Sequence, residues 1–568
     1  MTLFCTIGTH GHFGFSNRKS PLTDPPERGI VSSQNLQQMH QHTYRRKVSI
    51  LAGSILSVTA LMLGGHAQAQ SVQGFIPGNL VVLRSTYEDQ GEIANVVPNV
   101  TTLPTSTNTV AAGDGTFGNV LLNTAVDGNF GVTSPIFLDQ ITNSGTFVNS
   151  LNVTAAAGGS FTTSFTSRSE GALNLSQDGT SLTFIGYNAP IGAIDRSNAS
   201  TPGVTNFTNT DTATPTFKVV GQVDASGNLS TTLSNAYSGD NGRAAILGNN
   251  GVIYAVGNTG STVTTSSPTA ASVTGVQYIT PGVNATASSP GTQSAGSYSV
   301  TQNGYTADKL AKDNNFRGET IFNNTLYVTK GSGTQGINSV YMVGTAGSLP
   351  TGSSNTISIL PGFNTTLEKT AETGGNTNLF HPSGLWFANA ATLYVADEGN
   401  NLIADETTPD TNNPNAGLQK WVNSKPDGTG TWTMIYNLRA GLNLGQAYST
   451  PGYMTGSNAI TDVATDGLRE ITGKVNADGS VTIYAVTSTI SSAGDPGADP
   501  NELVAITDTI ADSTALQATG ESFSTIDSPV VGNVIRGVSF APTPEPTSAA
   551  MLGLGLLALG GVRRRNRS

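Results

Sequence analysis

Charged residues, most of them arginines, recur at the start of a repeated strand pattern. Their side chains could together bind an anion. They are Arg243, Arg317, Arg469, Arg536 and Glu170, with Ser383 at the matching position of one further repeat. A guanidinium group carries N–H donors in a fork that matches the two oxygens of a carboxylate or a sulfate. If the first strands of the repeats surround one axis, these side chains form a ring that could grip such a ligand.

These aligned residues, which we call the charged column, also have a structural interpretation. The arginines could donate to carbonyl groups at strand ends, with Glu170, Glu319 and Glu470 as their counterions. Both interpretations place the column on innermost strands, so ligand binding and a structural role stay open as alternatives.

Few other side chains of residues 70–543 could carry catalysis. This region contains no cysteine and one histidine, His381, which precedes Pro382 and has no partner motif. Disulfides, thiolate metal sites and zinc sites built on several histidines are therefore excluded from it. A Ser-His-Asp triad would need His381 as its base.

Two acidic loops could supply oxygen ligands to a cation. They span residues 397–400, with Asp405 and Glu406 nearby, and residues 495–502. Calcium takes about six to eight such ligands, but neither loop matches an EF-hand pattern. Solvated turns explain both loops more simply, so we expect no cofactor and keep Ca²⁺ as an alternative.

A repeated strand pattern must position the charged column. A strand with apolar, often aromatic, residues follows a Gly- or Asn-containing turn and recurs at intervals of roughly 70 to 100 residues, longer than ordinary propeller blades. The six copies are centred on residues 80–82, 183–185, 253–255, 326–328, 393–395 and 483–485. Each is followed by a further strand pattern, and no long amphipathic helix interrupts them.

This repetition predicts an all-β fold, a β-propeller of six blades, or of seven because the first interval is long. The first unit lacks its own first strand, and a spare strand, 536–540, follows the last unit. We therefore expect a ring closed by the C-terminal strand, which would remove open sheet edges. A β-sandwich array and a β-helix stay as alternatives.

The charge of the chain argues against one class of function, nucleic-acid binding. Charged residues are 11% of the 568-residue chain and the formal net charge is −11. Nucleic-acid binding needs a basic face that neutralises phosphates, so this chain is not expected to bind nucleic acid.

The N-terminal region carries an export pattern. Basic residues within 44–47 precede the apolar run 48–65 and a small-x-small site at Ala67 and Ala69. These are the three parts of a secretory signal peptide, cleaved by signal peptidase after Ala69. A permanent anchor is the alternative, because the apolar run is long. Residues 1–43 are either a disordered extension or a consequence of a misplaced start, with Met39 as the true one.

The C-terminal pattern also has three parts: Pro544, Glu545 and Pro546; a Gly- and Leu-rich segment, 547–562; and a basic cluster with Arg563, Arg564 and Arg565. As a helix the segment would cover roughly 24 Å, short of the roughly 30 Å hydrocarbon core. The arginines would hold its end in the cytoplasm.

In this order the three parts resemble a PEP-CTERM sorting signal. The resemblance covers the tail alone. It implies an exosortase substrate of Gram-negative bacteria that is exported across the inner membrane, transiently anchored by a short transmembrane helix and then released from its tail. It also implies a species that makes extracellular polysaccharide.

We therefore divide the chain into an extension (1–43), a signal peptide (44–69), a β-propeller (70–543) and a sorting segment (544–568). We expect a binding or structural module of the cell surface or extracellular matrix, rather than an enzyme, with exosortase, signal peptidase, the membrane and extracellular polysaccharide as partners. The alternative is an extracellular propeller hydrolase of glycans or phosphoesters. The turn 176–179 resembles a sialidase Asp-box, but its following tryptophan is missing.

Overall fold

The computed structural model describes thirteen stretches of the chain: 74–103, 112–113, 120–122, 131–204, 214–260, 273–307, 309–331, 335–373, 380–400, 414–448, 450, 463–491 and 496–545. The chain divides into two compact units, Met1–Ala69 and Gln70–Ser568, and all described residues belong to the second. Within these stretches no helix has both the length and the apolar character needed to cross a membrane.

Both predicted targeting segments lie outside the described residues, apart from the first two residues of the tail. The signal peptide 44–69, with Ala67 and Ala69, is outside them, and so is the tail from Pro546 through 563–565. The predicted short transmembrane helix at the C-terminus is therefore not supported, and both targeting patterns stay predictions.

Antiparallel sheets build the described part of the chain. Four of them have four strands each, ordered as the strands follow one another in sequence. They are β11 (Gly242–Leu247), β12 (Ile253–Gly257), β13 (Val276–Ile279) and β14 (Gln293–Gly296); β15 (Glu319–Phe322), β16 (Thr325–Lys330), β17 (Ser339–Val343) and β18 (Ile357–Ile359); β19 (Pro382–Asn389), β20 (Thr392–Asp397), β21 (Gly417–Asn423) and β22 (Trp432–Leu438); and β23 (Ala464–Val475), β24 (Ser480–Ile490), β25 (Leu503–Thr509) and β26 (Ser524–Asp527).

A larger sheet contains nine strands. They are β1 (Leu80–Thr86), β4 (Thr133–Ile141), β5 (Phe147–Asn152), β6 (Phe161–Ser164), β7 (Asn174–Leu175), β8 (Ser181–Asn188), β9 (Lys218–Asp224), β10 (Leu229–Ser234) and β27 (Asn533–Phe540). Their order is β10-β9-β8-β6-β4-β1-β27, with β5 on β4 and β7 on β8. A separate pair joins β2 (Ala112–Gly113) to β3 (Leu121–Leu122).

The helices of the described residues are short. They are α1 (Val153–Ala156), α3 (Leu310–Asp313), α4 (Glu368–Thr373) and the 3₁₀ turns Gly91–Asn95, Val300–Asn303, Pro496–Ala498 and Gln517–Gly520. Each of the six predicted apolar strands is present, within β1, β8, β12, β16, β20 and β24. In β12 every residue is buried, because the sheet packs against neighbours on both faces.

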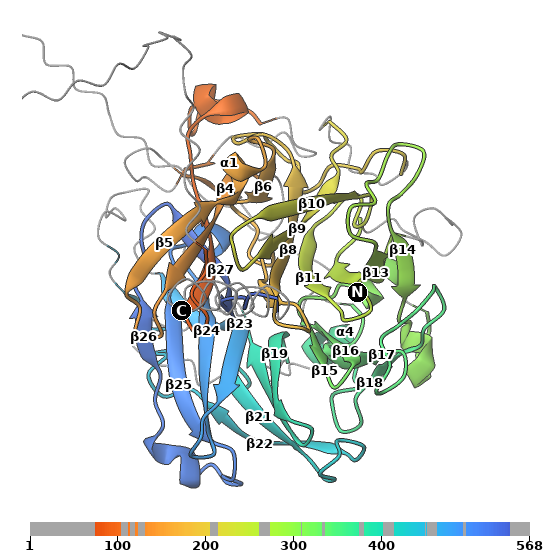
Figure 1. Cartoon of the computed structure of the whole chain (residues 1–568), viewed down its shortest axis with the longest axis vertical. Coiled ribbons are helices and arrows are strands. Elements are labelled where there is room, and N and C mark those ends of the chain that lie inside the picture. Colours follow the sequence, from red (N-terminus) through yellow and green to blue (C-terminus); the bar gives the residue numbers. More distant parts are fainter. Residues whose placement is uncertain are drawn as a thin grey trace, which may run out of the picture. The chain divides into compact units, whose positions relative to one another are not determined.

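The first strands of the sheets surround a common axis (Figure 1). β11 contacts β15, β15 contacts β19, β19 contacts β23, and β23 contacts β27. β7 contacts both β27 and β11. Sheets that radiate from such a ring are the defining feature of a β-propeller, so the predicted all-β propeller class is confirmed.

The prediction of six or seven separate four-stranded blades is wrong as stated. The structure has four separate four-stranded sheets, and the remaining long strands join into one sheet of nine. The cause is β6, which pairs with β4 on one side and with β8 on the other. Its sequence, Phe161 to Ser164, carries no signal that distinguishes a bridging strand from an ordinary one.

The C-terminal strand closes the ring as expected. β27 pairs antiparallel with β1 from Leu80 opposite Phe540 to Thr86 opposite Asn533, with one register shift after Leu83. The chain therefore enters and leaves this sheet side by side, and β1 has no free edge.

Glycine allows neighbouring first strands to approach closely at the axis. Gly318 and Gly384 each follow a residue of the charged column. A Cβ atom on Gly318 would overlap the carbonyl oxygen of Ser383, and one on Gly384 would lie 2.6 Å from the carbonyl oxygen of Arg469. Neither backbone oxygen could move without shifting its whole strand, so a side chain at either glycine would push the ring apart.

Aromatic side chains fill the space between successive sheets. Tyr298 and Tyr341 lie 4.9 Å apart between ring centroids in an edge-on arrangement. Phe322 of β15 stacks on Phe387 of β19 at 4.7 Å. These contacts hold adjacent sheets at a fixed angle and so fix where the first strands meet.

Candidate functional site

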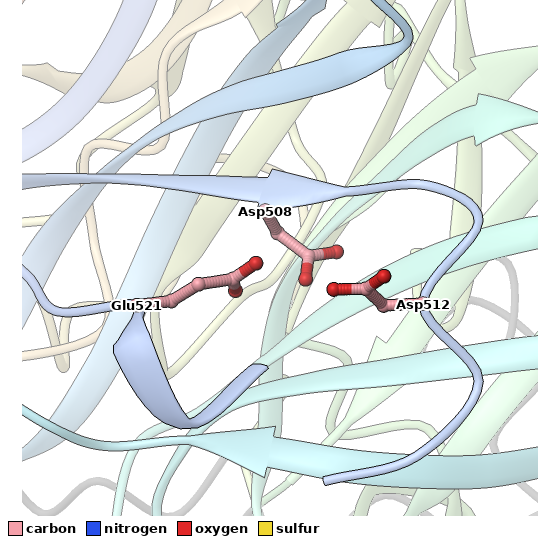
Figure 2. A group of neighbouring side chains, drawn as sticks. All are labelled: Asp508, Asp512 and Glu521. Carbon is pink, nitrogen blue, oxygen red and sulfur yellow. The ribbon is translucent and has the colours of Figure 1, made fainter. Parts of the chain in front are cut away.

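Three carboxyl groups meet where the sheet of β19–β22 packs against that of β23–β26 (Figure 2). Asp508, Asp512 and Glu521 each offer an oxygen within 4.8 Å of the others. A cation already faces this group, because Lys420 Nζ lies 2.9 Å from Asp508 Oδ2 with both side chains fully buried. Burial, with a hydrogen bond to Asp508, raises the pKa of Glu521 to about 8. The ammonium group of Lys420 and the raised pKa of Glu521 thus offset two of the three acids, and no metal ion is assigned.

The loops considered for calcium have other roles where the structure describes them. The carboxylate of Asp397 accepts hydrogen bonds from the backbone N–H groups of His381 (2.8 Å) and Gly399 (3.0 Å). Glu398 contacts arginines instead. Asp405, Glu406 and Asp495 lie outside the described residues.

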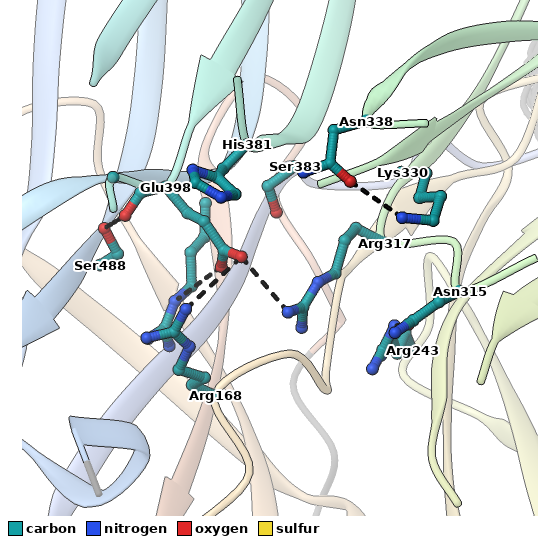
Figure 3. A network of polar contacts seen from close by, with 12 residues as sticks. Arg168, Arg243, Asn315, Arg317, Lys330, Asn338, His381, Ser383, Glu398 and Ser488 are labelled. Carbon is teal, nitrogen blue, oxygen red and sulfur yellow. Dashed lines mark hydrogen bonds and ion pairs between the residues drawn. The ribbon is translucent and has the colours of Figure 1, made fainter. Parts of the chain in front are cut away.

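Glu398 is the centre of a buried arginine cluster (Figure 3). Its Oε1 lies 3.3 Å from Arg317 Nη2 and 3.6 Å from Arg168 Nη2, and its Oε2 lies 3.9 Å from Arg469 Nε. Glu398 is 2% exposed and the three arginine side chains are 4–7% exposed. Three guanidinium groups thus share one carboxylate, and we call these four residues the axial cluster.

The backbone fixes Glu398 in place. It follows the last residue of β20, its N–H donates to the carbonyl oxygen of His381 (3.0 Å), and its own carbonyl accepts from Ser488 Oγ (2.5 Å). Because both backbone groups are bonded, the Cα atom from which the carboxylate extends is fixed between two strands.

The electrostatics of the axial cluster favour a net positive charge. Burial alone would raise the pKa of Glu398, but Arg317, Arg168 and Arg469 lower it to about 2, so its carboxyl group is ionised. Burial, together with Arg168, lowers the pKa of Arg469 to about 9. Near pH 7 the cluster thus holds three cations and one anion.

The neighbouring acids do not balance that charge. Burial, together with Glu398, raises the pKa of Glu470 to about 8. Burial raises the pKa of Asp397 to about 8 as well, and burial with Glu470 raises the pKa of Glu319 well above its usual value. Glu470 and Asp397 are therefore mostly protonated near pH 7. The predicted counterions Glu319 and Glu470 therefore do not serve the arginines, and Glu398 does.

Several guanidinium N–H groups of the axial cluster make no hydrogen bond to the described residues. They are Nε and Nη1 of Arg168 and Nε and Nη2 of Arg469, each on a buried atom. Unsatisfied buried donors are rare in folded proteins, because each loses its water without replacement. The site can therefore accept further oxygen atoms.

The structure does not bring the whole predicted column together. Arg536 donates to the carbonyl oxygens of Ser167 and Phe165, and Arg243 donates to that of Phe316 (3.0 Å). These two arginines tie neighbouring strands to each other, as the structural interpretation expected. Arg317 and Arg469 alone of the predicted arginines contact Glu398.

Glu170 is also fully engaged away from the arginines. Its carboxylate accepts from Thr163 Oγ1 (2.8 Å), the backbone N–H of Ser164 (3.0 Å), the hydroxyl of Tyr187 and Asn241 Nδ2 (2.7 Å). Four donors to one carboxylate make it a structural junction between strands.

Sequence reasoning missed Arg168 and placed Glu398 in an acidic loop that it interpreted as a solvated turn, with calcium binding as the alternative. Arg168 lies two residues before Glu170, the residue of the charged column in that repeat, and in the connection between β6 and β7. Aligning the first strands therefore did not find it. The available signal for Glu398 was its place directly after a buried strand, where side chains turn toward the axis.

His381 borders the axial cluster. Its Nε2 lies 3.6 Å from Glu368 Oε1, and burial lowers its pKa to about 4. The imidazole is thus neutral at pH 7. Its Nδ1 is buried, so it offers no accessible base to a dissolved substrate.

Comparison with known proteins gives the fold context alone. No family model matches the chain, and no curated protein matches it. The crystal structure of the polysaccharide lyase Uly1 is 11% identical, with a TM-score of 0.27, over 60% of this chain and 70% of that one. A quinonprotein alcohol dehydrogenase-like protein from Bacteroides thetaiotaomicron is 10% identical, with a TM-score of 0.27, over 72% and 85%. Similarity at this level indicates neither a shared activity nor a shared ligand.

Proposed function

We propose that this chain is an exported propeller that binds, at its axis, an extracellular ligand carrying an acidic group. Export and processing rest on the N-terminal signal pattern and on the PEP-CTERM-like tail that begins at Pro544. The mature module would act at the cell surface or in the extracellular matrix, with an acidic polysaccharide as the ligand.

We further propose that the propeller works as six blades. The nine-stranded sheet contains two four-stranded halves, β27-β1-β4-β5 and β7-β8-β9-β10. β6 joins them, and β27 and β7 occupy the places of first strands in the ring of contacts. Two fused blades and four separate ones give a ring that is closed at the first strands, and only the outer strand of each blade remains an edge.

The axial cluster is the observation that carries the binding proposal. It gathers three buried arginines on one ionised carboxylate and leaves guanidinium N–H groups without acceptors among the described residues. Arginine forks pair with carboxylates and sulfates in two parallel hydrogen bonds. The chain as a whole has a formal net charge of −11, so the axial cluster is a local positive site that would receive one acidic group of the polysaccharide.

The ion pairs of Glu398 argue for binding rather than turnover. A glycan hydrolase needs two carboxyl groups that reach the same bond of the substrate, one of them as the acid. Glu398 is paired with three arginines that hold it ionised, so it cannot serve as that acid.

Binding of the full-length protein to polysaccharides tests this function. A carboxylated polysaccharide should bind measurably by titration calorimetry, and a neutral one of similar length should not. Arg168→Gln should weaken binding, whereas Arg84→Gln, which removes one charge from the pair with Asp139, should not. Absence of binding to any acidic polymer, or release of new reducing ends during incubation, would refute the binding proposal.

A further inference from the structure

We infer that the axial cluster holds one small oxyanion, of the carboxylate or sulfate type, between Arg469 and Arg168 and beside Glu398. The inference deepens the proposed function and rests on it, because it names the group that the site takes. The inference goes beyond the proposed function in one respect: the site should also bind the free ion, without a polysaccharide.

The first argument is charge. Three guanidinium groups face one carboxylate, and burial raises the pKa values of two neighbouring acids, Glu470 and Asp397, to about 8. Burying cations without counterions is unfavourable, because the cations lose their hydration without replacement. An additional anion would bring the cluster closer to neutrality.

The second argument is the geometry of the free donors. Nε–H and Nη2–H of Arg469 lie on one edge of its guanidinium plane and point the same way, and neither donates to a described atom. That edge is a complete fork for two oxygens of one ligand. Arg168 adds two more donors, Nε and Nη1, from the connection between β6 and β7.

The third argument is that Glu398 cannot fill this fork itself. Its Oε2 lies 3.9 Å from Arg469 Nε, which is beyond hydrogen-bond distance. Its backbone N–H and carbonyl groups are both bonded, which holds its backbone in place. An oxygen atom from outside the cluster would fill the fork that Glu398 leaves open.

Burial sets the size of the occupant. Arg168, Arg469 and Glu398 are 4%, 6% and 2% exposed. Such a site encloses a single acidic group, either as a free ion or as the terminal group of a larger ligand.

Thermal unfolding of the full-length protein with sodium sulfate or sodium acetate tests the inference. We expect the midpoint to rise with the logarithm of the anion concentration beyond a threshold, above the rise in sodium chloride at equal ionic strength. Sulfate also stabilises proteins by exclusion from their surface, so the shift must be compared between variants.

Arg469→Lys keeps the charge but removes the fork, and it should lose the anion-specific shift. Arg84→Gln should retain it, because Arg84 pairs with Asp139 away from the cluster. Equilibrium dialysis with labelled sulfate gives a second readout that needs no unfolding, with one ion bound per wild-type chain. Equal shifts in wild type and Arg469→Lys, or no bound sulfate and no acetate effect, would overturn the inference.

The outcomes separate the two proposals. If an acidic polysaccharide binds but neither free ion does, the inference fails and the proposed function stands. If a free ion binds at the cluster but no acidic polysaccharide does, the inference stands and the proposed function fails. If nothing binds, both fail.

Discussion

Leu80 and Phe540 are opposite each other in the antiparallel pair of β1 and β27, although they lie near the two ends of the described chain. The amide of Ala541 extends this pairing by donating to the carbonyl oxygen of Asn79 (2.9 Å). The last strand of the domain is thus a structural part of its first sheet.

A chain that stops at residue 530 should therefore lose cooperative unfolding. Removing β27 exposes the edge of β1 and deletes the buried side chains of Val534 and Val538, so the apolar residues that they cover lose their packing. The matched control stops at Thr543, which keeps all of β27 and should unfold like the full-length protein. Thermal unfolding followed by circular dichroism measures both, and equal midpoints for the two truncations would contradict ring closure by β27.

Gly318→Ala should destabilise the protein by about 1–3 kcal/mol or more, because the new Cβ would overlap the carbonyl oxygen of Ser383 on the next first strand. Gly520→Ala is the control, since a Cβ there meets nothing within 4 Å. Denaturant unfolding gives the free energy of each variant. Similar values for the two would mean that the strands are not as close at the axis as described.

Glu398→Gln should cost about 3–5 kcal/mol, because it removes the carboxylate shared by three buried arginines. Glu92→Gln removes an acid that pairs with Arg196 while 47% exposed, and it should cost less than about 1 kcal/mol. The comparison uses denaturant unfolding at pH 7. A small loss for Glu398→Gln would show that the arginines have another counterion.

Glu470 should make stability fall with rising pH. Its pKa is raised to about 8 from a usual value of 4.5, so between these values the folded protein retains a proton that the unfolded chain has released. The stabilisation is complete below the lower value and is lost as pH rises through the upper one.

In Glu470→Gln the amide stays neutral at all pH values. The unfolding free energy of wild type minus that of this variant should therefore decrease from about pH 5 to about pH 8. A difference that stays constant with pH, or that increases, would show that Glu470 is ionised in the folded protein.

Lys420→Met should destabilise the protein by about 3–5 kcal/mol, because it leaves Asp508 fully buried without its cation. Calcium should not change the unfolding midpoint of wild type, since the ammonium group of Lys420 already faces the three acids. A calcium-dependent rise in the wild-type midpoint that Asp512→Asn abolishes would instead identify a metal site.

The sequence by itself determined the strands and their repetition. Each apolar strand buries both faces between neighbouring sheets, so its local composition is enough to predict it, as in residues 253–255 of β12. The spare strand 536–540 likewise had no partner in its own repeat, which left the first repeat as its place.

Tertiary structure alone decided the sheet boundaries and the partners of the charged residues. β6 pairs on both sides because of where the chain returns, and its four residues carry no mark of that role. Arg243 and Arg469 look equivalent in the repeat, yet one bonds a carbonyl group and the other faces Glu398. Ion pairs of this kind join residues from different repeats, and their geometry depends on distances across the axis that no local pattern encodes.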